Sequence, residues 1–277
     1  MEEGVRKKDY QKPIKISEGI FWIGYVDEKD GIQCNPYLIV DNDEAVLIDG
    51  GSRTDFSTVM MKILQTGVDP KIIKHLIYQH YDPDLCGSIP HLESVISRED
   101  LKILSHRENN VFIKYYSVSS PMECIETHNF KYKFSSGREL SFIRTPYSHS
   151  PGSFITYDEK TKTLFTSDIF GSYGSVWDLY IDLSTDCIKC NDYKNCPQNK
   201  KDCPIDGIEK FHKKIMPSKK ALNYALDKIV ELDSDIIAPQ HGSIIERKED
   251  QNIIIEKLKN LKSIGIDAFL EEIKNEK

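Results

Sequence analysis

The sequence predicts an α/β protein in which two strand-rich blocks are each followed by helices. Runs of β-branched and aromatic residues dominate positions 19–49 and 138–168, and apolar residues recur at helical spacing in 56–64, 216–232 and 251–261. The chain has 277 residues, 39% of them hydrophobic, which is enough to bury a large core. One large domain or two small ones would fit this length. Because no linker rich in Pro, Gly or Ser separates the blocks, we expect one domain over residues 1–277.

The first block reads as three short strands, a helix and a buried strand. The strands cover 19–26, 36–40 and 44–49, and each ends on Gly, Asp or Asn. The helix over 56–64 stops before Gly67. The apolar run at 71–79 is the buried strand, and it leads directly into the polar segment HYDPDLCG at 80–87.

The second block repeats this order. Strands are expected at 138–146, 153–158 and 163–168, each followed by a polar cluster. Pro217 suits the first turn of the helix over 216–232. That helix leads into a strand within 235–242, and an amphipathic helix over about 251–261 follows. Strands followed by helices, twice over, favour a layered α/β fold.

Charge and hydropathy exclude several classes of protein. The formal net charge of −7 offers no basic field for a nucleic acid backbone. No apolar run approaches the roughly 18 to 20 residues that a membrane helix needs, and the first residues do not resemble a signal peptide. We therefore expect a cytoplasmic protein that binds neither nucleic acid nor membrane.

Possible metal ligands follow four of the predicted strands. His80, Asp82 and Asp84 alternate after the strand at 71–79, so an extended segment would point all three to one side. Alone, this H-x-D-x-D run would equally fit a solvated turn with a capping aspartate. However, the other strand ends carry His149, Asp168 and His241. Loops at strand ends are where layered α/β folds form their sites.

Taken together, these residues resemble the metallo-β-lactamase superfamily, whose αββα sandwich binds two metals at one edge of its paired sheets. The resemblance covers about residues 16–245. Hydrolases of the superfamily usually carry H-x-H-x-D-H in the first loop, whereas this chain has Asp82 at the second His and Leu85 at the last. It is more similar to the flavodiiron proteins and related oxygen-binding di-iron proteins, which carry H-x-E-x-D there. The segments LFTSDIFG and APQHG are also close to that branch, although Asp82 is shorter than its usual Glu.

The resemblance implies a ligand set for two irons. His80, Asp82 and His149 would hold the first iron, Asp84 and His241 the second, and Asp168 would bridge the pair. Mixed carboxylate and imidazole ligation suits redox-active iron. Leu85 removes a possible ligand and leaves an open position for a diatomic molecule. Asp49 matches an early aspartate of the superfamily that orients a ligand histidine or its loop, although an aspartate closing a strand into a Gly-Gly turn is an equal alternative.

Four cysteines are clustered in a polar segment at about 186–204. Cys187, Cys190, Cys196 and Cys203 follow the spacing C-x2-C-x5-C-x6-C. With almost no apolar residues to fold it, this segment is expected to form around a metal, either structural zinc or an iron–sulfur cluster. Since Pro197 and Pro204 follow the last two cysteines, as prolines often follow cluster ligands, the pattern favours a four-iron four-sulfur cluster.

The remaining histidines and cysteines receive no role. The isolated cysteines are interpreted as buried small residues, although Cys86 could lie near the metals because it follows Asp84 by two positions. The unassigned residues are His75, His91, His106, His128, His212, Cys34, Cys86 and Cys124.

Three functions follow from these patterns. The leading one is a di-iron protein that binds and reduces dioxygen or nitric oxide, with electrons from a rubredoxin-like or ferredoxin-like carrier passing through the cysteine-ligated cluster. The family's flavodoxin domain is not found in this sequence, so no bound flavin is expected. A di-iron oxygen sensor with little turnover and a dinuclear hydrolase are the alternatives. The resemblance also implies a homodimer.

Overall fold

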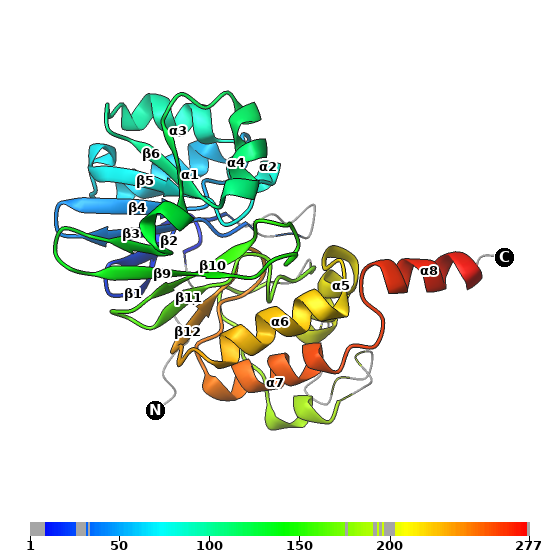
Figure 1. The fold of residues 1–277 in the computed structure, drawn as a ribbon. Coiled ribbons are helices and arrows are strands. Elements are labelled where there is room, and N and C mark those ends of the chain that lie inside the picture. The colour runs from blue at the N-terminus through cyan, green and yellow to red at the C-terminus, as the bar shows by residue number, and fades with distance from the viewer. Residues whose placement is uncertain are drawn as a thin grey trace, which may run out of the picture.

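The structure is a computed structural model, and it describes residues 9–25, 32, 34–174, 177–190, 193, 196 and 203–275. Two β-sheets pack face to face, and helices cover their outer faces (Figure 1). Aromatic and aliphatic side chains of both sheets fill the space between them, among them Trp22, Tyr37, Phe154 and Phe165. This arrangement confirms the predicted αββα sandwich.

The first sheet has seven strands in sequence order. They are β1 (Ile14–Ser17), β2 (Ile20–Trp22), β3 (Tyr37–Asp41), β4 (Glu44–Ile48), β5 (Ile73–Ile77), β6 (Lys102–Ser105) and β7 (Met122–Cys124). Neighbours are antiparallel from β1 to β4 and parallel from β4 to β7. All five side chains of β4 are buried, as expected for an inner strand with both faces covered.

Helices cover the outer face of this sheet. Val59, Ile63, Leu85 and Leu92 from these helices pack with strand residues in a second apolar cluster. The elements are α1 (Phe56–Gln65), η1 (Pro70–Ile72), α2 (Pro83–Cys86), α3 (Ile89–Ile96), α4 (Arg107–Ile113), η2 (Lys114–Tyr116) and η3 (Ile125–His128).

The second sheet has five strands in the order β12-β11-β10-β9-β8. They are β8 (Lys131–Lys133), β9 (Glu139–Arg144), β10 (Phe154–Asp158), β11 (Thr163–Phe165) and β12 (Ile236–Ala238), and only the β11–β12 pair is parallel. Its outer cluster includes Leu222, Leu226, Ile254 and Leu258. The elements on this side are η4 (Thr185–Ile188), α5 (Pro204–Ile215), α6 (Lys219–Val230), α7 (Lys248–Lys259) and α8 (Ile266–Asn275).

The sequence predictions locate eight of the twelve strands of the two sheets within a few residues, namely β2, β3, β4, β5, β9, β10, β11 and β12. The helices expected at 56–64, 216–232 and 251–261 are α1, α6 and α7. Strands β1, β6, β7 and β8 and helices α3, α4, α5 and α8 were not predicted. Within the described residues, no helix combines the length and the apolar character needed to cross a membrane.

Candidate metal centre

The four loops that carry the predicted ligands meet at one edge of the sandwich. His80, Asp82 and Asp84 follow β5, and Pro83 starts the short helix α2 between the two aspartates. His149 follows β9, Asp168 follows β11 and His241 follows β12. Loops that follow strands of both sheets therefore place their side chains in the same small volume. The structure brings all six predicted ligands together.

One group of ligand atoms is formed by His80, His149 and Asp168, with Asp82 beside it. Nε2 of His149 lies 3.2 Å from Oδ2 of Asp82 and 3.1 Å from Oδ2 of Asp168. Nε2 of His80 lies 3.7 Å from Oδ1 of Asp168 and 3.9 Å from Oδ2 of Asp82. Two imidazole nitrogens and two carboxylates thus face a common point.

A second group is formed by Asp84, His241 and Cys34. Nε2 of His241 lies 3.2 Å from Oδ2 of Asp84 and 3.7 Å from Oδ1 of Asp168. Asp168 therefore faces both groups of ligand atoms, which is the position that a ligand bridging two metal ions requires.

The Asp168 carboxylate gives a direct test of whether a cation fits. Its side chain is 4% exposed, and Oδ1 has no hydrogen-bond partner although it faces His80 and His241. An ionised oxygen without a partner is costly to bury. A metal on either side of Oδ1 would satisfy it, so the residues present fit two metal ions.

The electrostatics also favour added positive charge. Burial opposes ionisation of Asp168, but the facing histidines hold its pKa well below the usual range. Burial likewise lowers the pKa of His149, yet the hydrogen bonds to Asp168 and Asp82 outweigh it and raise that pKa to about 10. The neighbouring carboxylates thus favour a positive charge at His149 and His241, whose pKa values they raise against the effect of burial.

Neighbouring side chains hold the ligand loops. Nδ1 of His80 is 2.8 Å from Oγ of Ser167, which leaves Nε2 toward the carboxylates. Oδ1 of Asp49 accepts the backbone N–H of Gln79 at 3.1 Å, and Oδ2 accepts its amide Nε2 at 3.3 Å. Burial raises the pKa of Asp49 to about 8, against these hydrogen bonds. Asp49 thus fixes the residue before His80, and its hydrogen bonds are to Gln79 rather than to a ligand.

Two residues near the centre were assigned no role from the sequence. Cys34 was interpreted as a buried small residue, and it is 1% exposed, but it lies beside Asp84 and His241. The sequence position of Cys34 gives one signal for this. Cys34 directly precedes β3, which is antiparallel to β4, so the start of β3 lies at the same edge of the sheet as the ends of β4 and β5. Cys86, expected near the metals, is buried with Sγ facing the backbone oxygen of His80 at 3.7 Å.

His212 is the second such residue. Its Nδ1 donates to the carbonyl of Ile208 at 2.7 Å, and its Nε2 accepts the backbone N–H of Phe170 at 3.1 Å. The ring of the preceding Phe211 packs 5.6 Å from that of His241. Helix α5 therefore supports both the Asp168 loop and the His241 loop.

Comparison with known proteins identifies the family. A sequence model described as "ODP family beta lactamase" matches residues 32–242, which is most of the chain. The chain belongs to this family. Such a match confirms the predicted resemblance to the metallo-β-lactamase fold.

Curated relatives of this ODP-family chain include a flavo-diiron protein, FprA2, of Clostridium acetobutylicum, 25% identical over 256 residues and covering 85% of this chain and 58% of that one. The chain is 27% identical over 254 residues to an uncharacterized protein of Methanocaldococcus jannaschii, covering 88% of this chain and 59% of that one. It is 26% identical over 259 residues to the nitric oxide reductase of Moorella thermoacetica, covering 88% and 60%. The chain thus spans about 60% of the length of these three relatives.

Solved structures give the same picture. The structure described as a peroxy diiron species of the chemotaxis sensor ODP matches with a TM-score of 0.71 and 25% identity, over 95% of this chain and 99% of that one. Rubredoxin oxygen:oxidoreductase of Desulfovibrio gigas matches with a TM-score of 0.73 and 20% identity, over 90% and 61%. The second match supports the fold alone.

The ODP-family chain carries its four cysteines beside α5. Cys203 precedes the helix as its N-cap, and Cys187 and Cys203 pack against the outer apolar cluster of the second sheet. Burial raises the pKa of the Cys203 thiol, and Cys196 and Cys187 lie close enough to raise it further. In the described residues the four sulfurs are not among the ligand groups within 4.8 Å of one another.

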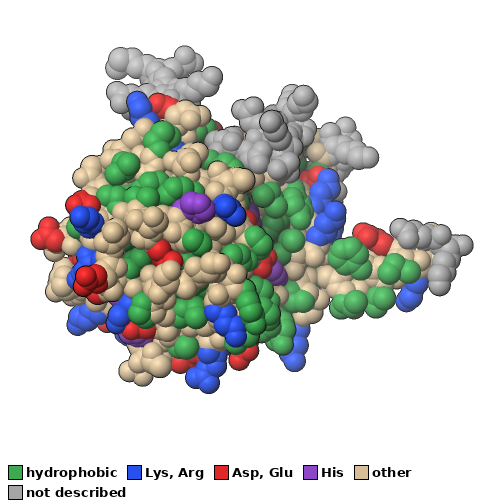
Figure 2. Space-filling view, turned by 90° about the horizontal axis from the view of Figure 1, so that it is seen from above, with side chains coloured by type: hydrophobic (Ala, Val, Ile, Leu, Met, Phe, Trp, Pro, Cys, Tyr) green, Lys and Arg blue, Asp and Glu red, His purple; other side chains and the backbone are tan. Residues whose placement is uncertain are grey.

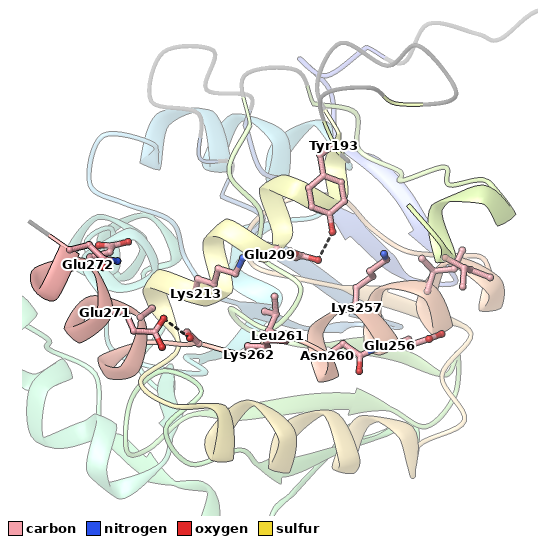
Figure 3. Close-up of a pocket in the computed structure, with 15 residues that line it drawn as sticks. Tyr193, Glu209, Lys213, Glu256, Lys257, Asn260, Leu261, Lys262, Glu271 and Glu272 are labelled. Atoms are coloured by element: carbon pink, nitrogen blue, oxygen red, sulfur yellow. Dashed lines mark hydrogen bonds and ion pairs between the residues drawn. The ribbon is translucent and has the colours of Figure 1, made fainter. Parts of the chain in front are cut away.

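A hollow of about 720 Å³ opens next to this cysteine segment (Figure 3). The side chains of α5, α7 and α8 surround it, and the Tyr193 hydroxyl hydrogen-bonds to Glu209 at its wall. Lys213, Lys257 and Glu271 give it a mixed charge. The hollow shares no residue with the metal centre.

Proposed function

We propose that this chain is a di-iron protein that binds dioxygen, with nitric oxide as an alternative ligand. The observation that carries the proposal is the buried Oδ1 of Asp168, which has no hydrogen-bond partner and faces imidazoles of two ligand groups. His80, Asp82 and His149 would hold the first iron, Asp84 and His241 the second, and Asp168 would bridge them.

The donor set supports iron over zinc. Carboxylates are harder and more anionic ligands than the imidazoles of zinc hydrolases, and mixed oxygen and nitrogen ligation suits redox-active iron. Leu85, at the place of a hydrolase histidine, is fully buried in the outer apolar cluster and supplies no ligand. These features weigh against the hydrolase alternative.

Bound iron would supply electrons and open coordination positions, and the protein would control access to them. Asp82 and Asp84 have side chains 32% exposed and His149 22%, whereas Asp168 and His80 are almost fully buried. A small molecule would therefore enter on the side of the two aspartates and His149. The buried side keeps water from the bridging carboxylate.

Metal analysis with one substitution tests this proposal. Anaerobically purified protein should contain about two irons per chain outside the cysteine segment, because the mixed donor set selects iron. Replacing Asp82 with histidine should raise the ratio of zinc to iron. Asp43→His adds an imidazole on an exposed turn and should leave the ratio unchanged. Two zincs and no iron in the wild type would overturn the proposal.

Reductase and sensor remain two functions of the same site. The relative named as a nitric oxide reductase favours a reductase. The match over nearly the whole length of both chains to a chemotaxis sensor favours the sensor. Oxygen consumption separates them: continued uptake with a reductant identifies a reductase, and a single uptake per iron pair identifies a sensor.

We also propose that the cysteine segment binds a four-iron four-sulfur cluster, with zinc as the alternative. Its support is position: Cys203 caps α5, whose residues Phe211 and His212 contact the His241 ring and the Asp168 loop. Such a cluster would relay electrons from a rubredoxin-like or ferredoxin-like carrier. Visible absorbance that dithionite bleaches and oxygen restores is the expected result, and a colourless zinc form would contradict it.

We further propose that the chain works in the cytoplasm as a homodimer of single-domain subunits.

A further inference from the structure

Cys34 touches two of the ligands proposed for the second iron. Its Sγ lies 3.8 Å from Nδ1 of His241, and the thiol faces Oδ2 of Asp84 at 4.0 Å. The side chain is 1% exposed, so water does not compete for these contacts. The Tyr25 hydroxyl also hydrogen-bonds to the sulfur.

The orientation of the His241 ring decides whether the Cys34 sulfur would bind the metal itself or would hold a metal ligand in place. Nε2 of His241 faces Asp84 and Asp168, at 3.2 and 3.7 Å, so a metal shared with these carboxylates binds Nε2. Cys34 is on the other side of the ring, at Nδ1. A metal-bound histidine usually donates its second N–H to a partner that fixes the ring and its tautomer.

His80 shows the same arrangement in the first group. Its Nε2 faces Asp168 and Asp82, and its Nδ1 contacts the Ser167 hydroxyl at 2.8 Å. Cys34 contacts Nδ1 of His241, just as Ser167 contacts Nδ1 of His80. In each group, one histidine therefore directs Nε2 toward the carboxylates and contacts a protein side chain at Nδ1.

The residue after Cys34 ties this position to the His241 loop. The backbone N–H of Asn35 donates to Gln240 at 2.8 Å, and its side-chain amide donates to the carbonyls of Pro239 and Gly242 at 3.0 and 2.9 Å. The indole N–H of Trp22 in turn donates to the side-chain Oδ1 of Asn35 at 2.8 Å. The hydrogen bonds of Asn35 thus fix the Cys34 sulfur and the His241 imidazole relative to each other.

We propose that Cys34 is a positioning residue for the second metal, with its sulfur accepting the Nδ1–H of His241 while its thiol contacts Asp84. This inference rests on the proposed dinuclear site. The partnerless Oδ1 of Asp168, aimed at the same place, points independently to a metal there. Cys34 holds two of that metal's ligands in register without binding it.

Cobalt titration of four proteins tests the proposal: wild type, Cys34→Ser, Cys34→Val and Cys86→Ala. Iron is removed by chelation, and Co(II) is added while visible spectra and electron paramagnetic resonance are recorded. Two cobalt ions sharing Asp168 couple magnetically, so loss of the second leaves the signal of a single ion. Cobalt at the cysteine segment contributes equally to all four proteins and cancels in the comparison.

The expected order of affinities for the second cobalt ion distinguishes a hydrogen-bonding role of Cys34 from a packing role. Cys34→Val keeps the volume but loses the acceptor, so affinity for the second cobalt should fall by about 10- to 100-fold. Cys34→Ser restores an acceptor and should recover most of it, and Cys86→Ala should bind as the wild type does. A valine variant that binds better than the serine variant would reduce Cys34 to a packing residue and overturn the proposal.

Two other outcomes are also decisive. A sulfur-to-cobalt charge-transfer band that disappears in both Cys34 variants would make Cys34 a direct ligand, which overturns the positioning role but leaves the dinuclear site intact. A wild type without the coupled pair would overturn the proposed function and this inference together.

Discussion

Arg138 is a buried charge that joins the two sheets. It precedes β9 in the second sheet, and its Nε and Nη2 each donate to the Asp158 carboxylate at 2.8 Å. Nη1 and Nη2 also reach the carbonyls of Val40 and Glu18, which belong to the first sheet and its β1–β2 turn. The side chains of Arg138 and Asp158 are 1% and 0% exposed.

Replacing Asp158 with asparagine should therefore destabilise the fold strongly. The substitution leaves the buried guanidinium with only the more distant carboxylate of Asp41, 3.9 Å from Nη1, and removing one partner of a buried ion pair typically costs about 3–5 kcal/mol. Urea unfolding would measure the loss. The matched control is Asp233→Asn, which removes exposed ion pairs to Lys162 and Lys248 and should leave the unfolding midpoint nearly unchanged. Equal unfolding midpoints for the two variants would contradict this account.

His212 predicts how stability depends on pH. Burial lowers its pKa to about 4, against an ordinary value of 6.5, although the Ile208 carbonyl opposes this. The unfolded chain then binds more protons below pH 6.5, so this contribution is complete above pH 6.5 and is lost as pH falls toward 4. A shift of this size corresponds to a loss on the order of 3 kcal/mol.

Unfolding measured between pH 4 and 7 checks this expectation. His212→Gln cannot gain a proton, so its stability should fall less steeply than that of the wild type over this range. Parallel pH profiles for the two proteins would show that His212 does not titrate in this way.

Helix α5 packs against the segment that follows Asp168, the proposed bridging ligand. A Cβ at Gly207 would lie 2.1 Å from the backbone oxygen of Tyr173, so only glycine permits this contact. Tyr173 and Ser172 follow the Asp168 loop directly. The packing of α5 should thus transmit any displacement to the loop that carries Asp168, the proposed bridging ligand.

Gly207→Ala tests this coupling. Alanine favours an isolated helix by about 1 kcal/mol over glycine, but the clash with fixed backbone is larger and should push α5 outward. We expect lower stability together with weaker metal binding. Gly67→Ala should lower stability by about 1–2 kcal/mol through its positive φ, in open space and without affecting metal binding. Unchanged metal affinity in Gly207→Ala would contradict the coupling.

Elements with strong local patterns were predictable, and contacts between distant segments were not. The apolar run of β5 and the helical spacing in α6 fix those elements from the chain alone. The six proposed ligands could be found because each follows a strand. Cys34 and His212 were not assigned because their partners are 207 and 42 residues away. Placing Cys34 requires the antiparallel pairing of β3 with β4, and placing His212 requires the packing of α5.

At the scale of the whole molecule, helix α8 presents an apolar face that the described residues do not cover. Helix α8 projects from the body, and hydrophobic side chains lie along it (Figures 1 and 2). No residue of α8 is buried, and Ile266, Phe269, Leu270 and Ile273 are 46–58% exposed at a helical repeat. A helix of ten residues is marginal in water without packing, so a second copy of the chain, which offers the same face, would cover it in the proposed homodimer.

Leu270→Glu should therefore convert the dimer to monomers without unfolding the core, because the new carboxylate would be buried at the contact. Sedimentation velocity at micromolar concentration measures the change. Asn275→Glu adds the same charge near the end of the helix outside the apolar repeat and should remain dimeric. If the metal centre needs only its own chain, as its six ligands indicate, the Leu270→Glu monomer should bind metal as tightly as the wild type. A wild type that sediments as a monomer would exclude α8 as a dimer contact.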